Sequence, residues 1–249
     1  MSMRLGLWAG WLVAPMFALT SRARRARTFH PRGPVYYAHA QRHTAAPPER
    51  HALADRFTGE VLLRFSGALW KREPRWLPDV LGCALPLSAT RREDARATAD
   101  DQDLLFATIR RPWTMLLSPW TTHVHDFLAN DYFAVSPFKS PELTQLFYLR
   151  LHPFHFRRVA AETRGVRLAW AVSAGDVLLD LECSARPWGP WLPLSQLRLQ
   201  RMAEVDAEAL RFDPFRNGRS IRPYGFIHGL RRGVYTLSQH SRPRSCATD

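Results

Sequence analysis

Six short segments with the character of β-strands recur along this chain of 249 residues, and they constrain its fold more than any other feature. Each one alternates apolar with polar residues or forms a short apolar run, as strands do. Charged or proline-rich stretches at 41–55, 90–101 and 185–193 predict loops. Regular strands with long connections favour an antiparallel barrel over a parallel sheet. The predicted strands are 60–66, 79–87, 103–109, 165–172, 176–183 and 195–200.

The N-terminal stretch differs from the remainder of the chain. Residues 5–20 are apolar and contain Pro15, whereas a membrane-spanning helix needs ~20 such residues. Four arginines follow this stretch, while a secretory signal carries its charge before the apolar core. We therefore predict two parts, an arm over 1–26 and one domain over 27–249. The arm is expected to pack on the domain or on a partner subunit of a homo-oligomer. The alternative is peripheral membrane contact through residues 5–27.

Cysteine content and charge limit the cellular context. Cys83, Cys183 and Cys246 are odd in number and scattered, which indicates a reducing, cytoplasmic compartment, with membrane association as the alternative. The net charge of +13 comes almost entirely from arginine, because Lys71 and Lys139 are the only lysines. No known nucleic-acid module accompanies this charge, so no nucleic-acid partner is expected. A basic structural protein that contacts nucleic acid or membrane remains a competing class, and its binding would weaken steeply with salt.

Two histidine pairs have the spacing of metal ligands. They are His123-x-His125 and His152-x-x-His155. Neither pair has a nearby cysteine or a convincing set of carboxylates, so we predict surface or packing histidines.

Strand periodicity places two polar side chains together in the segment 60–66. Successive residues of a strand point to opposite faces, so Val61, Leu63 and Phe65 share one face. Leu62, Arg64 and Ser66 share the other. This second face either lines a site or is open to water.

The segment 225–242 is rich in glycine and arginine. On a helix, Arg231, Tyr235, Ser238 and Arg242 fall on one stripe. A phenol ionises near pH ~10, and a cation one turn away favours its phenolate, which is a ligand for ferric iron. The alternative is an ordinary amphipathic helix whose polar stripe faces water.

This segment and its approach resemble the C-terminal part of a haem catalase domain. The matching motifs are A-E-V-D at 203–206, F-D-P at 212–214, I-R-P at 221–223 and R-x-x-x-Y at 231–235. Earlier motifs follow the family's order too: R-T-F-H-P-R-G at 27–33, V-L-L-R-F-S at 61–66, D-V-L-G-C-A at 79–84 and D-L-L at 103–105. The run Y-F-A-V-S-P-F at 132–138 resembles the small monodomain catalase-like proteins, the catalase-related peroxidases. The resemblance implies an α+β fold: a catalase-like antiparallel β-barrel with flanking α-helices and a C-terminal helix that carries Tyr235.

The resemblance also implies a cofactor, haem b, and its ligands. Tyr235 corresponds to the residue that binds the iron, and Arg231 to the cation that keeps it ionised. Arg27, Arg64 and Arg242 correspond to residues that pair with the haem propionates.

Three further residues correspond to catalytic groups of the family. His30 would move a proton between the two peroxide oxygens, and Ser66 would orient its imidazole. Thr108 stands where the family has an asparagine that holds peroxide over the iron. Loss of one oriented donor costs on the order of 100-fold in rate. The resemblance therefore implies a peroxidase or weak catalase acting on hydrogen peroxide or small organic hydroperoxides. The alternative is a degenerate barrel that binds haem or an apolar ligand without efficient catalysis.

Overall fold

The computed structural model describes most of the domain but not the ends of the chain. Five of the predicted site residues, Arg27, His30, Arg231, Tyr235 and Arg242, lie outside the described residues, as do the predicted arm and C-terminal helix. The described residues are 33–70, 73, 76–88, 98, 100–157, 160–175, 177–205, 210, 212–213 and 215–225.

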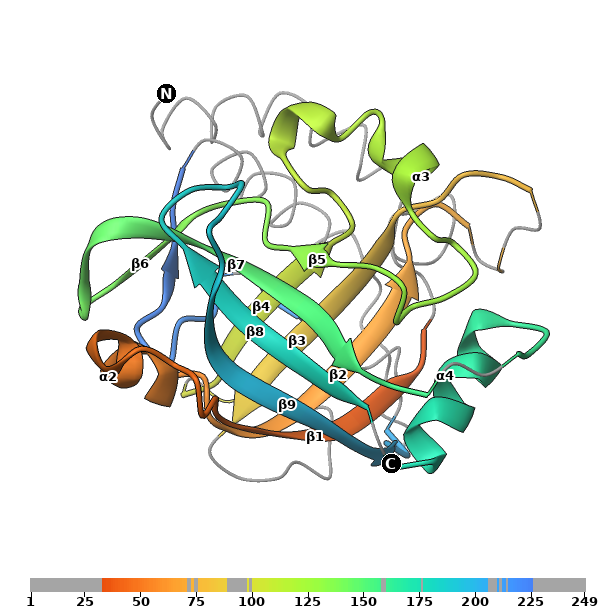
Figure 1. Cartoon of the computed structure of the whole chain (residues 1–249), viewed down its shortest axis with the longest axis horizontal. Coiled ribbons are helices and arrows are strands. Elements are labelled where there is room, and N and C mark those ends of the chain that lie inside the picture. The colour runs from red at the N-terminus through yellow and green to blue at the C-terminus, as the bar shows by residue number, and fades with distance from the viewer. Residues whose placement is uncertain are drawn as a thin grey trace, which may run out of the picture.

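Within these residues, eight antiparallel strands close into a barrel (Figure 1). Around the barrel they follow the order β1-β2-β3-β4-β5-β7-β8-β9, and β9 pairs with β1 to close the ring. Two short strands extend the sheet beyond β7: β6 pairs with β7, and β10 pairs with β6. The predicted antiparallel barrel is confirmed. The strands are β1 (Val35–Arg42), β2 (Gly59–Gly67), β3 (Leu81–Ser88), β4 (Gln102–Ala107), β5 (Tyr132–Phe133), β6 (Phe138–Ser140), β7 (Leu143–His155), β8 (Leu178–Ser184), β9 (Leu192–Met202) and β10 (Arg222–Pro223).

The helices of the described residues are short and lie outside the barrel (Figure 1). They are η1 (Pro48–Arg50), α2 (His51–Asp55), η2 (Pro112–Thr114), α3 (Ser118–Thr121) and α4 (Arg164–Ser173). No helix in this part of the chain is long and apolar enough to cross a membrane. Strand dominates the described structure, so the α+β class stays a prediction that depends on the helix expected over 225–242.

One predicted strand is wrong, because residues 165–172 belong to helix α4. The Thr163 hydroxyl caps the helix by accepting the Val166 N–H at 3.3 Å. The buried residues Arg164, Leu168, Ala171 and Val172 then recur with the helical period. The other five predicted strands are confirmed within a few residues at each end. Five strands were not predicted: β1, β7 and the short strands β5, β6 and β10.

The barrel interior is filled by the inward-facing side chains. Phe65, Cys83 and Phe106 lie side by side on β2, β3 and β4 and belong to the main hydrophobic cluster. The ring of Phe65 also contacts Phe127 and Tyr132, with centroids 5.3 and 5.8 Å apart. Because side chains fill the interior, a ligand that binds the described strands would lie on their outer face.

Candidate functional site

Two of the predicted site residues lie together on the outer face of β2. Arg64 and Ser66 point away from the core that contains Val61, Leu63 and Phe65, as the alternation predicts. Their exposed fractions are only 2% and 5%. The alternative that this face is open to water is therefore wrong.

The neighbouring residues on this outer face are mostly small. Antiparallel pairing places Ala84 opposite Arg64, and Gly82 opposite Ser66. One strand further, Ala107 lies opposite Gly82. Directly opposed residues share a face of the sheet, so these three positions form a low surface beside the two polar side chains. We call Ala84, Gly82 and Ala107 the small-residue floor.

A later part of the chain covers the edge of this face. The guanidinium of Arg64 lies over the ring of Phe212, 5.9 Å from its centroid. Leu62, two residues before Arg64, packs in a second hydrophobic cluster with Val35, Tyr37, Ala203 and Leu210. The approach to the C-terminal segment therefore lies against the same outer wall that carries Arg64.

Gly33, the first described residue, also contacts β2 close to Ser66. A Cβ at this position would collide with the carbonyl oxygen of Phe65 and come within 2.9 Å of the Ser66 Cα. The next residue, Pro34, accepts the Phe65 N–H at 3.1 Å. Only glycine allows this contact of backbone on backbone, so the motif at 27–33 ends directly against Ser66.

Thr108 lies just past the end of β4, and its hydroxyl is engaged by the protein. It accepts the Leu81 N–H at 3.1 Å and lies 2.7 Å from the Thr122 hydroxyl. The Thr122 hydroxyl donates to the Ser118 carbonyl at 2.8 Å, so the proton shared by the two threonines comes from Thr108. To donate to a substrate, Thr108 would first have to release Thr122.

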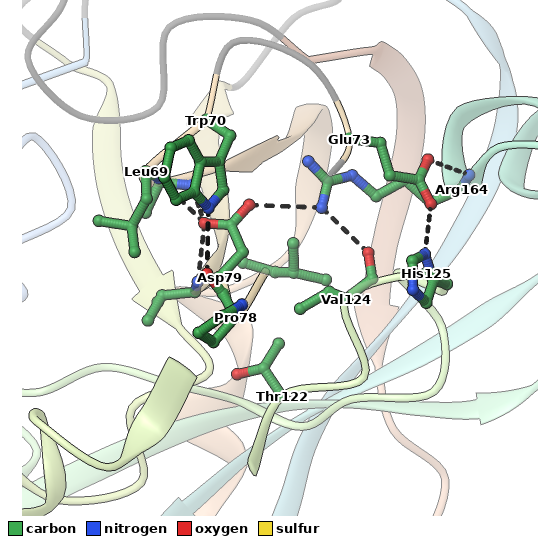
Figure 2. Close-up of polar contacts among 12 residues, drawn as sticks. Leu69, Trp70, Glu73, Pro78, Asp79, Thr122, Val124, His125 and Arg164 are labelled. Carbon is green, nitrogen blue, oxygen red and sulfur yellow. Dashed lines mark hydrogen bonds and ion pairs between the residues drawn. The ribbon is translucent and has the colours of Figure 1, made fainter. Parts of the chain in front are cut away.

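A buried ion pair fixes the ends of β2 and β3 next to this face (Figure 2). One oxygen of the fully buried Asp79 accepts three backbone N–H groups of the β2–β3 connection, at 2.8 to 3.2 Å. Its other oxygen lies 3.5 Å from the Arg164 guanidinium, which also donates to the Val124 carbonyl at 3.0 Å. A Cβ at Gly67 would collide with the Arg164 guanidinium. The D-V-L-G-C-A motif thus supplies a structural carboxylate, Asp79, and a floor residue, Gly82.

The same network continues to the surface through Glu73. Its carboxylate accepts the Arg164 backbone N–H at 2.7 Å and lies 2.9 Å from the His125 ring nitrogen (Figure 2). Helix α4, which contributes Arg164, was predicted as a strand, so the pairing of Arg164 with Asp79 was not predicted. Arg164 is the main residue of the region that sequence reasoning missed.

Two further motifs that resemble those of catalases, D-L-L and F-D-P, contact each other through Asp103 on β4. Its carboxylate accepts the backbone N–H of Asp213 at 2.8 Å and the Arg216 guanidinium at 2.6 Å. The Asp103 side chain is fully buried. The D-L-L and F-D-P motifs are thereby joined, which holds the C-terminal approach on the outer wall of the barrel.

The histidine pairs lie elsewhere. His123 and His152 line a cleft of about 680 Å³ beside β7, together with Asp126 and Asp131. His152 bonds Asp131 at 2.6 Å, and this hydrogen bond raises the pKa of His152 above its ordinary value. Within the described residues, no group of three or more histidine, cysteine or acidic side chains is arranged to hold a metal ion.

Comparison with known proteins supports the fold alone. No family model and no curated protein matches the chain. A bacterial catalase structure matches with a TM-score of 0.59 and 13% identity, over 90% of this chain and 58% of the catalase. A fungal catalase structure matches with a TM-score of 0.59 and 11% identity, over 88% and 59%. The chain thus has a catalase-like fold and spans less than two thirds of the length of these catalases.

Proposed function

We propose that the protein binds haem b on the outer face of β2–β4 and reacts with hydrogen peroxide or small organic hydroperoxides, as a peroxidase or weak catalase. The observation that carries the proposal is the placement of Arg64 and Ser66 on one outer face of β2, with the small-residue floor on the strands opposite them. A flat, largely apolar group with acidic substituents suits such a surface, because small residues allow a close approach to the strands and a cation can pair with the acidic substituents. Bound ferric haem would supply the redox centre on which peroxide reacts.

The described residues fit this group at the propionate end. Arg64 is a buried cation, and its guanidinium is the side chain best suited to bind a carboxylate through two parallel hydrogen bonds. In the proposal, Arg27 and Arg242 complete the propionate contacts. All three assignments derive from the catalase motifs of the sequence.

Buried tyrosines of the barrel support the need for a cation beside the iron ligand. Burial raises the pKa of Tyr36 to about 12 and that of Tyr132 well above its usual value. The Tyr132 hydroxyl remains protonated and donates to the Phe127 carbonyl at 2.7 Å. In the proposal, Tyr235 would bind the iron as a phenolate, and Arg231 would supply a positive charge that favours this ionised form.

The acid–base group of the proposal is His30. It lies three positions before Gly33, and three steps of extended chain reach at most about 11 Å. Because Gly33 contacts Ser66, His30 is within reach of the outer face of β2. There it would take a proton from one peroxide oxygen and return it to the other, while the Ser66 hydroxyl orients the imidazole.

The Thr108 geometry favours a second candidate, a catalase-fold barrel that binds haem or an apolar ligand without efficient catalysis. The Thr108 proton is already donated to Thr122, so Thr108 does not offer peroxide the oriented donor that an asparagine amide would. Haem binding without peroxide turnover would support this candidate over the first.

Haem titration of two tyrosine variants tests the proposal. Tyr235→Phe should lose stoichiometric haem or shift its absorption spectrum, because the anionic ligand is gone. Tyr148→Phe removes a hydroxyl from a half-buried residue of β7 and should change neither. His30→Ala should keep haem and lose its rapid reaction with peroxide. An unchanged tyrosinate-type spectrum in Tyr235→Phe would remove Tyr235 from the site.

A further inference from the structure

The connection that follows β4 carries an unusual set of exposed side chains. We call residues 109–122 the apolar segment; it contains η2 and α3 and runs along the top of the molecule in Figure 1. Large apolar side chains point to solvent from five of its positions. Their exposed fractions are 64% for Trp113, 52% for Met115, 79% for Leu116, 64% for Leu117 and 71% for Trp120.

The hydroxyl groups of the same segment point inward to its own backbone. Thr114 donates to the Arg111 carbonyl at 3.0 Å, and Ser118 donates to the Thr114 carbonyl at 2.9 Å. Thr122 donates to the Ser118 carbonyl at 2.8 Å. Ser118 is only 2% exposed, whereas Leu116 and Leu117 beside it are open. This is the reverse of a normal surface loop, and it suits a segment whose outer side meets an apolar medium.

Two other connections add apolar side chains near this segment. β2 ends, β3 begins and β4 ends at the same end of the barrel, so the β2–β3 connection emerges beside residue 108. That connection exposes Trp76 by 88% and Leu77 by 50%. From the β8–β9 connection, Trp188 joins through Arg111, whose guanidinium lies 5.7 Å from the Trp113 ring centroid and 5.8 Å from that of Trp188. We call the apolar segment with Trp76, Leu77 and Trp188 the aromatic rim.

The charge of the rim selects an anionic partner. The apolar segment contains Arg110 and Arg111 and no aspartate or glutamate, in a chain with a net charge of +13. Arg110 is exposed. Tryptophan concentrates at the boundary between lipid tails and headgroups, and arginine pairs with lipid phosphates. We propose that the aromatic rim docks the protein on the surface of an anionic lipid bilayer. In this proposal the contact is peripheral.

Co-sedimentation of the full chain with lipid vesicles tests this proposal. Vesicles of phosphatidylcholine with phosphatidylglycerol should pellet the protein, and those of phosphatidylcholine alone should pellet less. The double variant Leu116→Glu/Leu117→Glu should weaken binding to the anionic vesicles about tenfold or more, because charges enter the contact. Trp170→Glu is the matched control, since Trp170 is 61% exposed but lies on α4. It should bind as the wild type does.

Three results would overturn the proposal. One is wild-type protein that stays in solution with both kinds of vesicle. Another is a double variant that pellets as well as the wild type. The third is a wild-type dimer in size-exclusion chromatography that the double variant converts to monomers, which would make a second copy the occupant of the rim. Haem titration is unaffected by these outcomes, so the docking surface and the haem site are tested separately.

Discussion

Two stretches of the barrel's outer wall carry an arginine in mid-strand, and they use it differently. On β7, Arg150 is half-buried and is paired with Glu182, at 2.5 Å, and Asp131, at 3.3 Å. On β2, Arg64 is 2% exposed, lies over Phe212 and has Ala84 opposite it on the next strand. The wall of β7–β8 is an ordinary charged surface. The wall of β2–β4 is instead covered by later parts of the chain, such as Phe212, and the proposal places a haem against it.

The largest effect is expected from Gly33→Ala, at the edge of the β2 wall. The new Cβ would collide with the Phe65 carbonyl oxygen, so β1 or β2 must shift. We expect a loss of about 1–3 kcal/mol or more in the free energy of unfolding, measured with urea. The control is Gly165→Ala on α4, where a Cβ meets nothing within 4 Å. It should leave stability unchanged or raise it by up to about 1 kcal/mol. Equal effects of the two variants would contradict the close contact at Gly33.

The next largest effect is on haem binding, and it distinguishes Arg64 from Arg150. Arg64→Met should weaken haem binding about 10–100-fold, the value of one hydrogen bond to a charged group. Arg150→Met should leave haem affinity unchanged and lower stability by about 1–3 kcal/mol, because the half-buried Glu182 carboxylate loses its partner. Haem titration followed by absorption measures both. If Arg64→Met bound haem as tightly as Arg150→Met, the propionate assignment of Arg64 would be wrong.

The smallest expected effect is a pH dependence of the free energy of unfolding, which comes from His152 on β7 and its partner Asp131. The hydrogen bond to Asp131 raises the pKa of His152. Burial alone would raise the pKa of Asp131, but the bond from His152 and the charge of Arg150 lower it below its usual value. The stabilisation that protonated His152 contributes to the folded protein is therefore present at low pH and is lost as pH rises through the raised pKa of His152. The Asp131 contribution is lost as pH falls through its lowered pKa. The pair stabilises most between about pH 4 and pH 6.5.

Urea midpoints at about pH 5.5 and pH 8 measure this effect in the wild type and in His152→Gln. The wild type should lose more stability than the variant as pH rises. Identical pH dependence in the two proteins would show that the pair does not form. Because both side chains are partly exposed, the difference should be small.

Alternation along a strand was sufficient to predict the faces of β2. It placed Arg64 and Ser66 together and opposite Phe65, and the structure confirms that placement. It did not predict their burial, because the covering residues, such as Phe212, are distant in sequence. Only a tertiary contact decides whether the outer face of a strand meets water or protein.

Specific caps and contacts explain the errors in the predicted elements. The run 165–172 contains apolar residues compatible with a strand, but the Thr163 cap and the packing of Leu168 and Val172 select a helix. β7 was not predicted; Pro153 interrupts its hydrogen bonding near the end, where the register with β8 shifts. The engagement of Thr108 by Thr122 likewise follows from a fold of the chain after β4 and has no sequence motif.

The absorption spectrum of the purified chain, produced with adequate iron, tests the central claim most directly. The account predicts one haem per chain with a tyrosinate-type spectrum in the wild type and in Arg150→Met, and loss or a shift of that spectrum in Tyr235→Phe. A wild-type protein that stays colourless after haem is added would contradict the proposal that the buried wall of β2–β4 is a haem site.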